Sequence, residues 1–455
     1  MPQDVVSPTT GETLRSYPTH DAREVAAAIE AAQRAFEAWR HAPFAQRSRC
    51  MRAAARELRD TARELAVLMA EEMGKPVRDG RAEVEKCAWA CEYYAEHAEA
   101  FLRSEPVATD ARESYVAFRP LGVVLAVMPW NFPFWQVFRF AAPALMAGNA
   151  ALLKHASNVP GCALAIEAVF ARAGFPAGLF RSLLIPSGAA LEAIRHPLVR
   201  AVTLTGSTAA GRAVAAAAGE RLKKTVLELG GSDPYLVLAD ADPARAAEIC
   251  AASRLVNGGQ SCIAAKRFVV VESRRAAFEA ELVRRMGAAR LGDPLREETT
   301  LGPQARRDLR DELHRQVEAS VAAGARCLLG GTVPEGPGAF YPPTVLADVR
   351  PGMPAYDDEL FGPVAAVIPV RDEREAVAVA NDSVFGLGAA VLTGDAERGR
   401  AIAELELEAG ACFVNAAVKS DPRLPFGGVK ESGYGRELAA FGIREFVNVK
   451  AVWVA

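Results

Sequence analysis

Paired cysteines are absent from this sequence. Its eight cysteines are scattered along 455 residues, and no two stand at the Cys-x-x-Cys spacing of a redox pair or a metal-ligand pair. Most of them lie among Ala, Leu and Val, where a free cysteine behaves as a small hydrophobic side chain. The absence excludes a disulfide-dense secreted scaffold and indicates a reducing compartment, which we expect to be the cytoplasm.

Leader-like, membrane-spanning and strongly charged segments are also lacking. Residues 1–12 have neither the basic run nor the apolar run of a secretory signal. The most apolar stretch, 122–138, is interrupted by Asn131 and two prolines, which argues against a membrane helix. A formal net charge of −3 gives no electrostatic footprint for nucleic acid or for an anionic membrane. We therefore expect a small-molecule substrate, with neither nucleic acid nor a membrane as partner.

A regular alternation of strand and helix patterns is present instead. With 51% hydrophobic residues, a chain of 455 residues is too long for a single compact core. Apolar residues recur at helical spacing over 22–39 and 45–103, so the first hundred residues are expected to be mostly helical. Two series of apolar runs and helical patterns follow, which predicts βαβ units around parallel sheets. The expected strands are 121–128, 150–154, 180–185, 201–205 and 224–229 in the first series, and 234–238, 267–272, 365–369, 388–392 and 412–415 in the second.

Two further segments, 114–118 and 446–454, have strand patterns outside both series. An open strand edge is a template for pairing with another strand or another chain. We interpret the two segments as an exposed ribbon that joins this chain to a second copy.

Cys262 is the residue whose surroundings carry the most chemical information. It ends the run Asn-Gly-Gly-Gln-Ser-Cys, a polar loop that favours access to the thiol. A thiol that attacks an aldehyde needs an oxyanion donor, a hydride acceptor and a base for the later hydrolysis. Asn131 offers an amide donor and Glu228 a carboxylate at the end of an apolar run. These residues predict an aldehyde oxidation site, although Cys262 could be a buried structural thiol and Glu228 could cap a helix or pair with an arginine.

A glycine-containing turn marks a candidate cofactor site. The segment 205–211 follows an expected strand and opens an expected helix over 209–221, so Ser207 and its neighbouring amides stand where phosphate binds well. Its glycines do not have the G-x-G-x-x-G spacing, and such a turn can also be only a turn. Lys154 ends the strand 150–154, where open α/β sheets bind ligands, and it could also be a surface lysine. Ser157, three residues on, is small and uncharged.

Taken together, these residues and six sequence blocks make the chain resemble the aldehyde dehydrogenase superfamily over essentially its whole length. The resemblance implies Cys262 as nucleophile, Glu228 as general base and Asn131 as oxyanion donor. It implies ribose contacts for Glu359 and Lys154 and a pyrophosphate contact for Ser207, with the cofactor site completed by Trp130, Ser157, Gly206 and Phe361. The blocks that carry it are Pro-Trp-Asn-Phe-Pro at 129–133, Thr-Gly-Ser-Thr at 205–208, Glu-Leu-Gly-Gly at 228–231, Gly-Gln-Ser-Cys at 259–262, Glu-Leu-Phe-Gly-Pro at 359–363 and the run 425–433.

The superfamily implies an α/β fold with two Rossmann-like domains and a small β oligomerisation ribbon. On this basis, residues 1–101 and 120–230 are expected to form a dinucleotide-binding domain and 231–435 a catalytic domain. Residues 102–119 and 436–455 are expected to supply the oligomerisation strands of a homodimer or homotetramer. A non-catalytic binding protein of the same fold is a second interpretation, which the intact Cys262 makes the weaker one.

The substrate is expected to be acidic because of Arg139, a guanidinium in an otherwise apolar segment that must be matched by an anion. The anion could be a buried Asp or Glu of the chain itself, or a carboxylate of the substrate held through two N–H groups. Runs such as 154–160 and 419–425 resemble the short bacterial succinate-semialdehyde dehydrogenases, which implies that Arg139 and Ser420 bind the substrate. Lys419 or Arg423 could assist.

Two departures keep alternatives open. Some members of that group have a second arginine six residues before the nucleophile, where this chain has Val256. Glutarate semialdehyde or a neutral aliphatic aldehyde therefore stays a possible substrate. Many relatives have a glutamate where Ser157 stands, and without it a 2′-phosphate meets no repulsion, so NADP is expected ahead of NAD. His155 has no second histidine or carboxylate at ligand spacing, and we expect a structural role for it and no metal.

Overall fold

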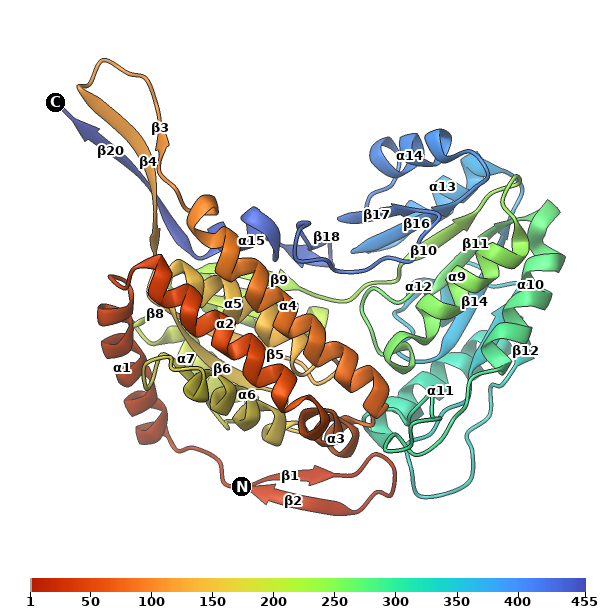
Figure 1. The fold of residues 1–455 in the computed structure, drawn as a ribbon. Coiled ribbons are helices and arrows are strands. Elements are labelled where there is room, and N and C mark those ends of the chain that lie inside the picture. The colour runs from red at the N-terminus through yellow and green to blue at the C-terminus, as the bar shows by residue number, and fades with distance from the viewer. Residues whose placement is uncertain (1) are drawn as a thin grey trace.

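A computed structural model describes residues 2–455 of the chain. One part of it is built on a six-stranded sheet in the order β19-β9-β8-β5-β6-β7 (Figure 1). Neighbouring strands of this sheet run parallel, except for β19, which pairs antiparallel with β9. The strands are β5 (Val123–Met128), β6 (Ala150–His155), β7 (Phe180–Ser182), β8 (Val199–Thr205), β9 (Lys224–Glu228) and β19 (Gly433–Tyr434). The strands β5 to β9 lie at the positions predicted for the five strands of the first series.

Helices cover this sheet, and the predicted helical stretch 45–103 is divided into three of them. Gly74 ends α3 with a φ of 78°, a left-handed conformation that favours glycine. Pro76 then precedes α4, and a proline restricts the residue before it to extended backbone. The helices are α1 (Ala22–Trp39), α2 (Phe44–Asp60), α3 (Ala62–Met73), α4 (Val77–Phe101), α5 (Trp135–Ala147), α6 (Pro160–Arg172), α7 (Ser187–Arg195) and α8 (Thr208–Gly219).

The other part is built on a seven-stranded sheet in the order β12-β13-β14-β11-β10-β16-β17. It is parallel apart from the pair β12 and β13, two strands that sequence periodicity did not reveal. Both are only four residues long, and β12 is partly exposed, so neither shows a clear alternation. The strands are β10 (Pro234–Val237), β11 (Arg267–Val271), β12 (Arg326–Leu329), β13 (Thr344–Ala347), β14 (Val364–Val370), β16 (Gly388–Leu392) and β17 (Ala411–Val414).

Helices alternate with the strands of the seven-stranded sheet, as the predicted βαβ units require. They are α9 (Pro243–Leu255), α10 (Glu272–Gly287), α11 (Arg307–Ala322), α13 (Glu373–Asn381) and α14 (Ala396–Leu405), with a single short turn, α12 (Pro354–Asp357), added before β14. Within residues 2–455, no helix combines the length and the apolar character that crossing a membrane requires.

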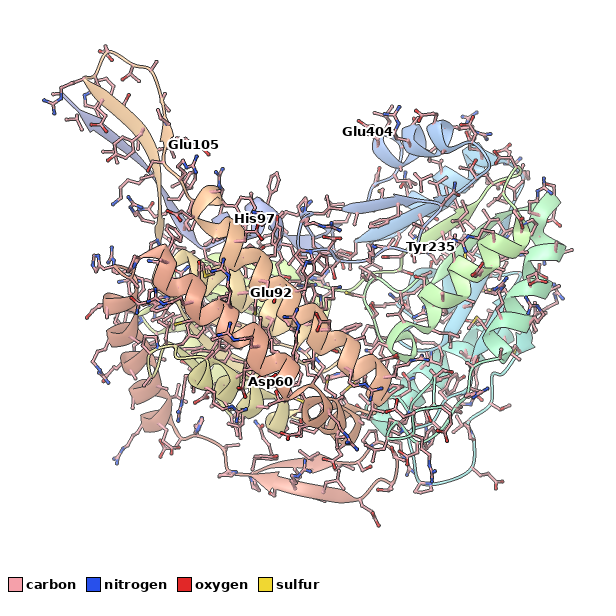
Figure 2. All side chains as sticks on the ribbon, viewed as in Figure 1. Asp60, Glu92, His97, Glu105, Tyr235 and Glu404 are labelled. Atoms are coloured by element: carbon pink, nitrogen blue, oxygen red, sulfur yellow. The ribbon has the colours of Figure 1, made fainter. Side chains whose placement is uncertain are left out.

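A ribbon projects from the body of the molecule (Figure 1). The two outlying segments are strands, and they pair with each other: β4 (Glu113–Pro120) and β20 (Val447–Val454) run antiparallel along their whole length. A short strand, β3 (Glu105–Pro106), pairs with β4. At the base of the ribbon, where Figure 2 labels Glu105, its carboxylate accepts a 2.6 Å hydrogen bond from Arg444 of α15 (Ala439–Glu445). The remaining pairs are β1 (Gln3–Val6) with β2 (Thr13–Tyr17) and β15 (Phe385–Gly386) with β18 (Val429–Lys430).

Candidate active site

A cavity of about 270 Å³ lies between the two sheets and contains the predicted nucleophile. The six-stranded sheet contributes loops that follow the carboxyl ends of β5, β8 and β9, which is where open α/β sheets bind ligands. The other part of the molecule contributes Cys262 and two segments near residues 309 and 360. The lining residues are Pro129, Trp130, Asn131, Gln136, Thr205, Gly206, Ser207, Leu229, Gly230, Cys262, Leu309, Glu359 and Phe361.

The loop that carries Cys262 has a backbone that ordinary residues rarely adopt. After α9 the chain enters a 3-10 turn, Val256–Gly259, in which Asn257, Gly258 and Gly259 have φ values of 53°, 64° and 75°. A Cβ atom at Gly259 would lie 2.2 Å from the carbonyl oxygen of Gly362, so only glycine fits there. The turn brings the thiol to the cavity at the end of a rigid loop.

A buried lysine holds the nucleophile loop in place. The Nζ of Lys266 donates to the carbonyl oxygens of Ser261 at 3.0 Å, Cys262 at 2.8 Å and Ala264 at 3.3 Å. The same ammonium lies 3.4 Å from a carboxylate oxygen of Glu359. Lys266 therefore links the nucleophile to one of the predicted ribose contacts.

The thiol of Cys262 is protonated in this environment. Burial raises its pKa to about 12, and the positive charges of Arg139 and Lys266 oppose the rise only in part. A thiolate is the reactive form of cysteine. The site must therefore supply a base or an additional positive charge before attack.

The amide of Asn131, the predicted oxyanion donor, is held by two hydrogen bonds. Its side-chain oxygen accepts a 3.1 Å hydrogen bond from Gln136 Nε2, and its Nδ2 donates to the carbonyl oxygen of Gln260 at 3.0 Å. The amide nitrogen has two hydrogens, so one donor is left for a ligand. Asn131 is 3% exposed and shares the cavity with Cys262.

Glu228 lies at the end of β9 with its carboxyl group shut away from solvent. Neither carboxyl oxygen has a hydrogen-bond partner among residues 2–455. Burial, and then the negative charge of Glu437, raise the pKa of Glu228 well above its usual range, whereas Arg139 lowers it. In this position the carboxyl group favours its neutral form, has no hydrogen bond to any described residue and does not line the cavity.

Arg139, on α5, is matched by an anion of the chain itself. Its guanidinium forms a buried ion pair with Glu437, which sequence reasoning had left open as an alternative and had not located. It also donates to Thr205 Oγ1 at 3.3 Å and lies over the ring of Phe426, 4.7 Å from the centroid. Arg139 lines neither the nucleophile cavity nor the second large cavity described below, so its binding of a substrate carboxylate stays a prediction.

Ser420 is buried and hydrogen-bonded to two residues that the sequence did not single out. Its Oγ accepts from Lys86 Nζ at 2.7 Å and from Trp135 Nε1 at 3.1 Å. The neighbouring Lys419 is exposed, with no hydrogen bond or ion pair to any described residue. Arg423 pairs with Asp421 at 2.7 Å on the surface. Ser420, Lys419 and Arg423 line neither the nucleophile cavity nor the second cavity described below.

Five of the seven predicted cofactor residues meet in the nucleophile cavity. Trp130 and Phe361 pack edge to face with centroids 5.7 Å apart, and Glu359 accepts a 3.2 Å hydrogen bond from the amide of Gly231. Ser207 caps α8, where its hydroxyl accepts from Ala210 N at 3.3 Å. The predicted helix after this turn is confirmed. The five residues are Trp130, Gly206, Ser207, Glu359 and Phe361.

The other two, Lys154 and Ser157, lie beside this cavity at the end of β6. Lys154 is 8% exposed, and burial lowers the pKa of its ammonium. It is paired in register with Val127 on β5 and has no ion pair with any described residue. Next to the exposed Ser157, the amide atoms of Asn158 are shielded from solvent and hydrogen-bond to nothing in residues 2–455. An unpartnered buried lysine and amide fit a polar ligand at this edge.

His155 has the structural setting that its sequence surroundings indicated. It is buried, with Nε2 2.9 Å from the carbonyl oxygen of Pro133 and Nδ1 accepting from the amide of Ala156 at 2.9 Å. Burial lowers the pKa of the imidazole to about 4, so the ring is neutral at physiological pH.

Several residues of the site gave no sequence signal. Lys86, Lys266 and Glu437 lie in segments whose pattern is that of an ordinary helix or turn. Each has one partner far away in sequence: Ser420 for Lys86, Glu359 for Lys266 and Arg139 for Glu437. Lys86 meets Ser420 across 334 positions. A single sequence reveals such pairs only once the fold has brought the segments together.

Comparison with known proteins decides the family. The aldehyde dehydrogenase family model matches residues 1–452. This chain belongs to the aldehyde dehydrogenase family. Among its relatives is the succinate-semialdehyde dehydrogenase 1 of Mycobacterium tuberculosis, whose name specifies NADP(+), 50% identical over 458 residues that cover 100% of both chains. The Escherichia coli succinate semialdehyde dehydrogenase Sad, named for NAD(P)+, is 47% identical over 448 residues, 98% of this chain and 97% of its own.

Solved structures give the same family assignment. The succinic semialdehyde dehydrogenase of Streptococcus pyogenes, solved in complex with NADP+, superimposes with a TM-score of 0.97 at 37% identity and covers 99% of each chain. The predicted superfamily and α/β fold class are therefore confirmed, and the chain is an aldehyde dehydrogenase family protein with the nucleophile, amide and carboxylate of that prediction present.

Proposed function

We propose that this aldehyde dehydrogenase family member oxidises succinate semialdehyde to succinate, with NADP preferred to NAD as hydride acceptor. The observation that carries the proposal is the shared cavity of Cys262 and Asn131, with Glu228 at the adjoining strand end. Full-length relatives at about half identity, named for this substrate and for NADP(+), support the choice of aldehyde and cofactor.

The first chemical step is the attack of Cys262 on the aldehyde carbon. Its Sγ bonds to the carbonyl carbon, the thiol proton passes to water, and the electron pair of the broken C=O π bond leaves negative charge on the former carbonyl oxygen. The free N–H of Asn131 and the backbone N–H of Cys262 stabilise that oxyanion, and removal of one such donor costs roughly 10²–10³ in rate. The nearby guanidinium of Arg139 favours the thiolate, because its charge lowers the pKa of Cys262.

The second step is hydrolysis of the resulting thioester. When bound, the nicotinamide cofactor supplies the acceptor for the hydride that the aldehyde carbon loses. Glu228 first loses its own proton to water. Turned toward the cavity, the carboxylate then takes a proton from the water that attacks the acyl carbon, and general-base help of this kind contributes about 10²–10⁴ in rate. Cys262 leaves as thiolate, and the carboxylic acid is released.

The residues of this site fit a nicotinamide cofactor. Trp130, Glu359 and Phe361 line the cavity beside the nucleophile, and Ser207 begins α8, whose N-terminus favours phosphate. Lys154, buried without an ion pair, would hold ribose hydroxyls, and the uncharged Ser157 would admit a 2′-phosphate.

We also propose a homodimer or homotetramer built through the ribbon, in the cytoplasm. The support for assembly is the exposed apolar side chains of β20, where Val449 is 61% and Trp453 is 56% exposed. The support for a reducing compartment is that all eight cysteines are free thiols.

Initial rates of the purified protein test the function. Succinate semialdehyde and butanal have the same number of carbons, but only the first has a carboxylate. We expect kcat/KM with NADP to be at least about tenfold higher for the acid, the size of one charge-assisted contact. Equal or better use of butanal would remove the acidic substrate and leave a dehydrogenase of neutral aldehydes, and glutarate semialdehyde as a third substrate tests chain length. The same assay with NAD tests the cofactor preference.

A further inference from the structure

A second cavity, of about 520 Å³, has four cations and two carboxylates among its lining side chains. The cations are Lys75, Arg78, Lys86 and Arg285, and the carboxylates are Asp79 and Glu83. Lys75 forms a buried ion pair with Glu83, Arg78 lies 3.4 Å from Asp79, and Arg285 lies 3.6 Å from Glu281. Within the described residues 2–455, Lys86 alone among the four has no carboxylate within ion-pair distance.

Lys86 is also held in a fixed position. Its Nζ donates to Ser420 Oγ at 2.7 Å and lies 4.2 Å from the centroid of the Trp135 ring. Burial, followed by the positive charge of Arg139, lowers the pKa of Lys86 to about 8. An ammonium in that setting is stabilised by an anion, and the chain supplies none in contact with it.

The donors around Lys86 point to the shape of the missing anion. Ser420 Oγ accepts from both Lys86 and Trp135, and its own O–H has no acceptor among the described residues. The Lys86 ammonium has three hydrogens and uses one of them on Ser420. Free N–H groups and a free O–H group, on atoms 2.7 Å apart, match the two oxygens of a carboxylate.

The cavity reaches the edge of the reaction site. Phe132, which lines it, follows the oxyanion donor Asn131 directly. Asn257, which also lines it, donates to the carbonyl oxygen of Asn131 at 2.7 Å. Val256 lies on the same wall, so that position supplies no cation. Arg139 is excluded from the lining and its charge is matched by Glu437.

We propose that Lys86, together with the hydroxyl of Ser420, binds the distal carboxylate of the aldehyde substrate. The assignment rests on the proposed function and deepens it, because it names the charge that selects an acidic aldehyde. Lys86 determines specificity and takes no part in the bond changes at Cys262.

Kinetics of Lys86→Met with two aldehydes test the assignment. We expect the KM for succinate semialdehyde to rise about 10- to 100-fold, as expected for loss of a charge-assisted contact, with kcat within about threefold of wild type. The kinetic constants for butanal should stay within about twofold, because that substrate has no carboxylate. Lys86→Arg, which keeps the charge, should recover most of the affinity. Lys419→Met, a change of the same kind at the exposed neighbour of Ser420, is the matched control and should change no constant by more than about twofold.

The outcomes distinguish failure of the assignment to Lys86 from failure of the proposed function. If the wild type prefers the acid and Lys86→Met keeps the wild-type KM for it, the carboxylate is bound elsewhere and the assignment to Lys86 is overturned alone. A raised KM for both aldehydes would also overturn it, since the residue would then act on cavity structure. If the wild type itself shows no preference for the acid, the proposed function fails and this assignment fails with it. Thermal unfolding of each variant checks that the fold is intact.

Discussion

The side chain of Cys262 is a protonated thiol, and this protonation state limits its reactivity as a nucleophile. The surrounding groups do not include a partner that accepts its proton in the described structure, and Glu228 is turned away from the cavity. Activation of the nucleophile therefore depends on a rearrangement or on the charge of a bound ligand. This arrangement limits reaction of the thiol when no ligand is present.

The rate of alkylation of Cys262 should follow pH steeply. Burial raises its pKa to about 12, so the thiolate fraction, and with it the rate of reaction with iodoacetamide, should rise about tenfold per pH unit between about pH 7 and pH 10. Peptide-resolved mass spectrometry measures the rate at Cys262 separately, because the exposed Cys327 would react with the reagent as well. A rate that levels off near pH 8 would contradict the protonated state of the thiol.

Several of the residues that sequence reasoning found lie in short loops whose local pattern is itself unusual, whereas Glu228 lies on β9 and Arg139 on α5. Cys262, Asn131 and Ser207 stand in loops rich in Gly, Pro or small polar residues. Lys86 stands on a long helix, and its role depends on Ser420 from the other end of the chain. Arg139 was recognised as needing an anion, but Glu437 could be located only in three dimensions. Local sequence patterns reveal candidate functional loops, whereas contacts between distant segments can be located only in the folded structure.

At the scale of elements, α4 fixes the start of α5. The carboxylate of Glu83 accepts 2.9 Å hydrogen bonds from the backbone amides of Phe134 and Trp135, and its other oxygen pairs with Lys75. Amides at the start of a helix have no partner within the helix, so a carboxylate there stabilises it. Because α5 carries Gln136 and Arg139, this contact positions both the oxyanion donor and the buried ion pair.

In the proposed assembly, the ribbon is the element that contacts a second copy of the chain. Val449 and Trp453 are four residues apart on β20, so they share one face of the strand, and both are exposed. We expect Val449→Glu with Trp453→Glu to convert the assembly to smaller species, because two charges would be buried at the interface. Analytical ultracentrifugation measures the mass.

The control for the ribbon is Lys450→Gln, on the opposite face of the same strand, which should leave the mass unchanged. A wild-type monomer, or an unchanged mass in the double variant, would contradict assembly through this surface. Far-ultraviolet circular dichroism should be the same for all three proteins, since β20 pairs with β4 within one chain.

At the scale of the whole molecule, a late segment of the chain returns to the six-stranded sheet. The strand β19 joins that sheet next to β9, and Glu437, three residues further on, meets Arg139 on α5. Strand and helix periodicity predicted the two α/β series because most of their strands are buried apolar runs. It missed β12, β13 and the two-residue strand β19, and so it missed the return of the chain.

Two cavities approach the loop that carries Cys262. One has Cys262 and five of the predicted cofactor residues in its lining, and the other has Lys86 and Asn257 of that loop in its lining. In the proposed function, the cofactor would bind in the first cavity and the aldehyde would enter through the second. Both would then reach the thiol together, as the proposed transfer of hydride from a Cys262 adduct requires.

Trapping the acyl group on Cys262 tests the central claim most directly. Glu228→Gln removes the proposed base and keeps the size of the side chain, so turnover should fall by roughly 10²–10⁴ while attack by the thiol continues. Mixed with succinate semialdehyde and NADP and then quenched with acid, this variant should give about one equivalent of NADPH and a peptide in which Cys262 is heavier by one succinyl group. A burst of NADPH without an adduct, or an adduct on another cysteine, would contradict covalent catalysis by Cys262.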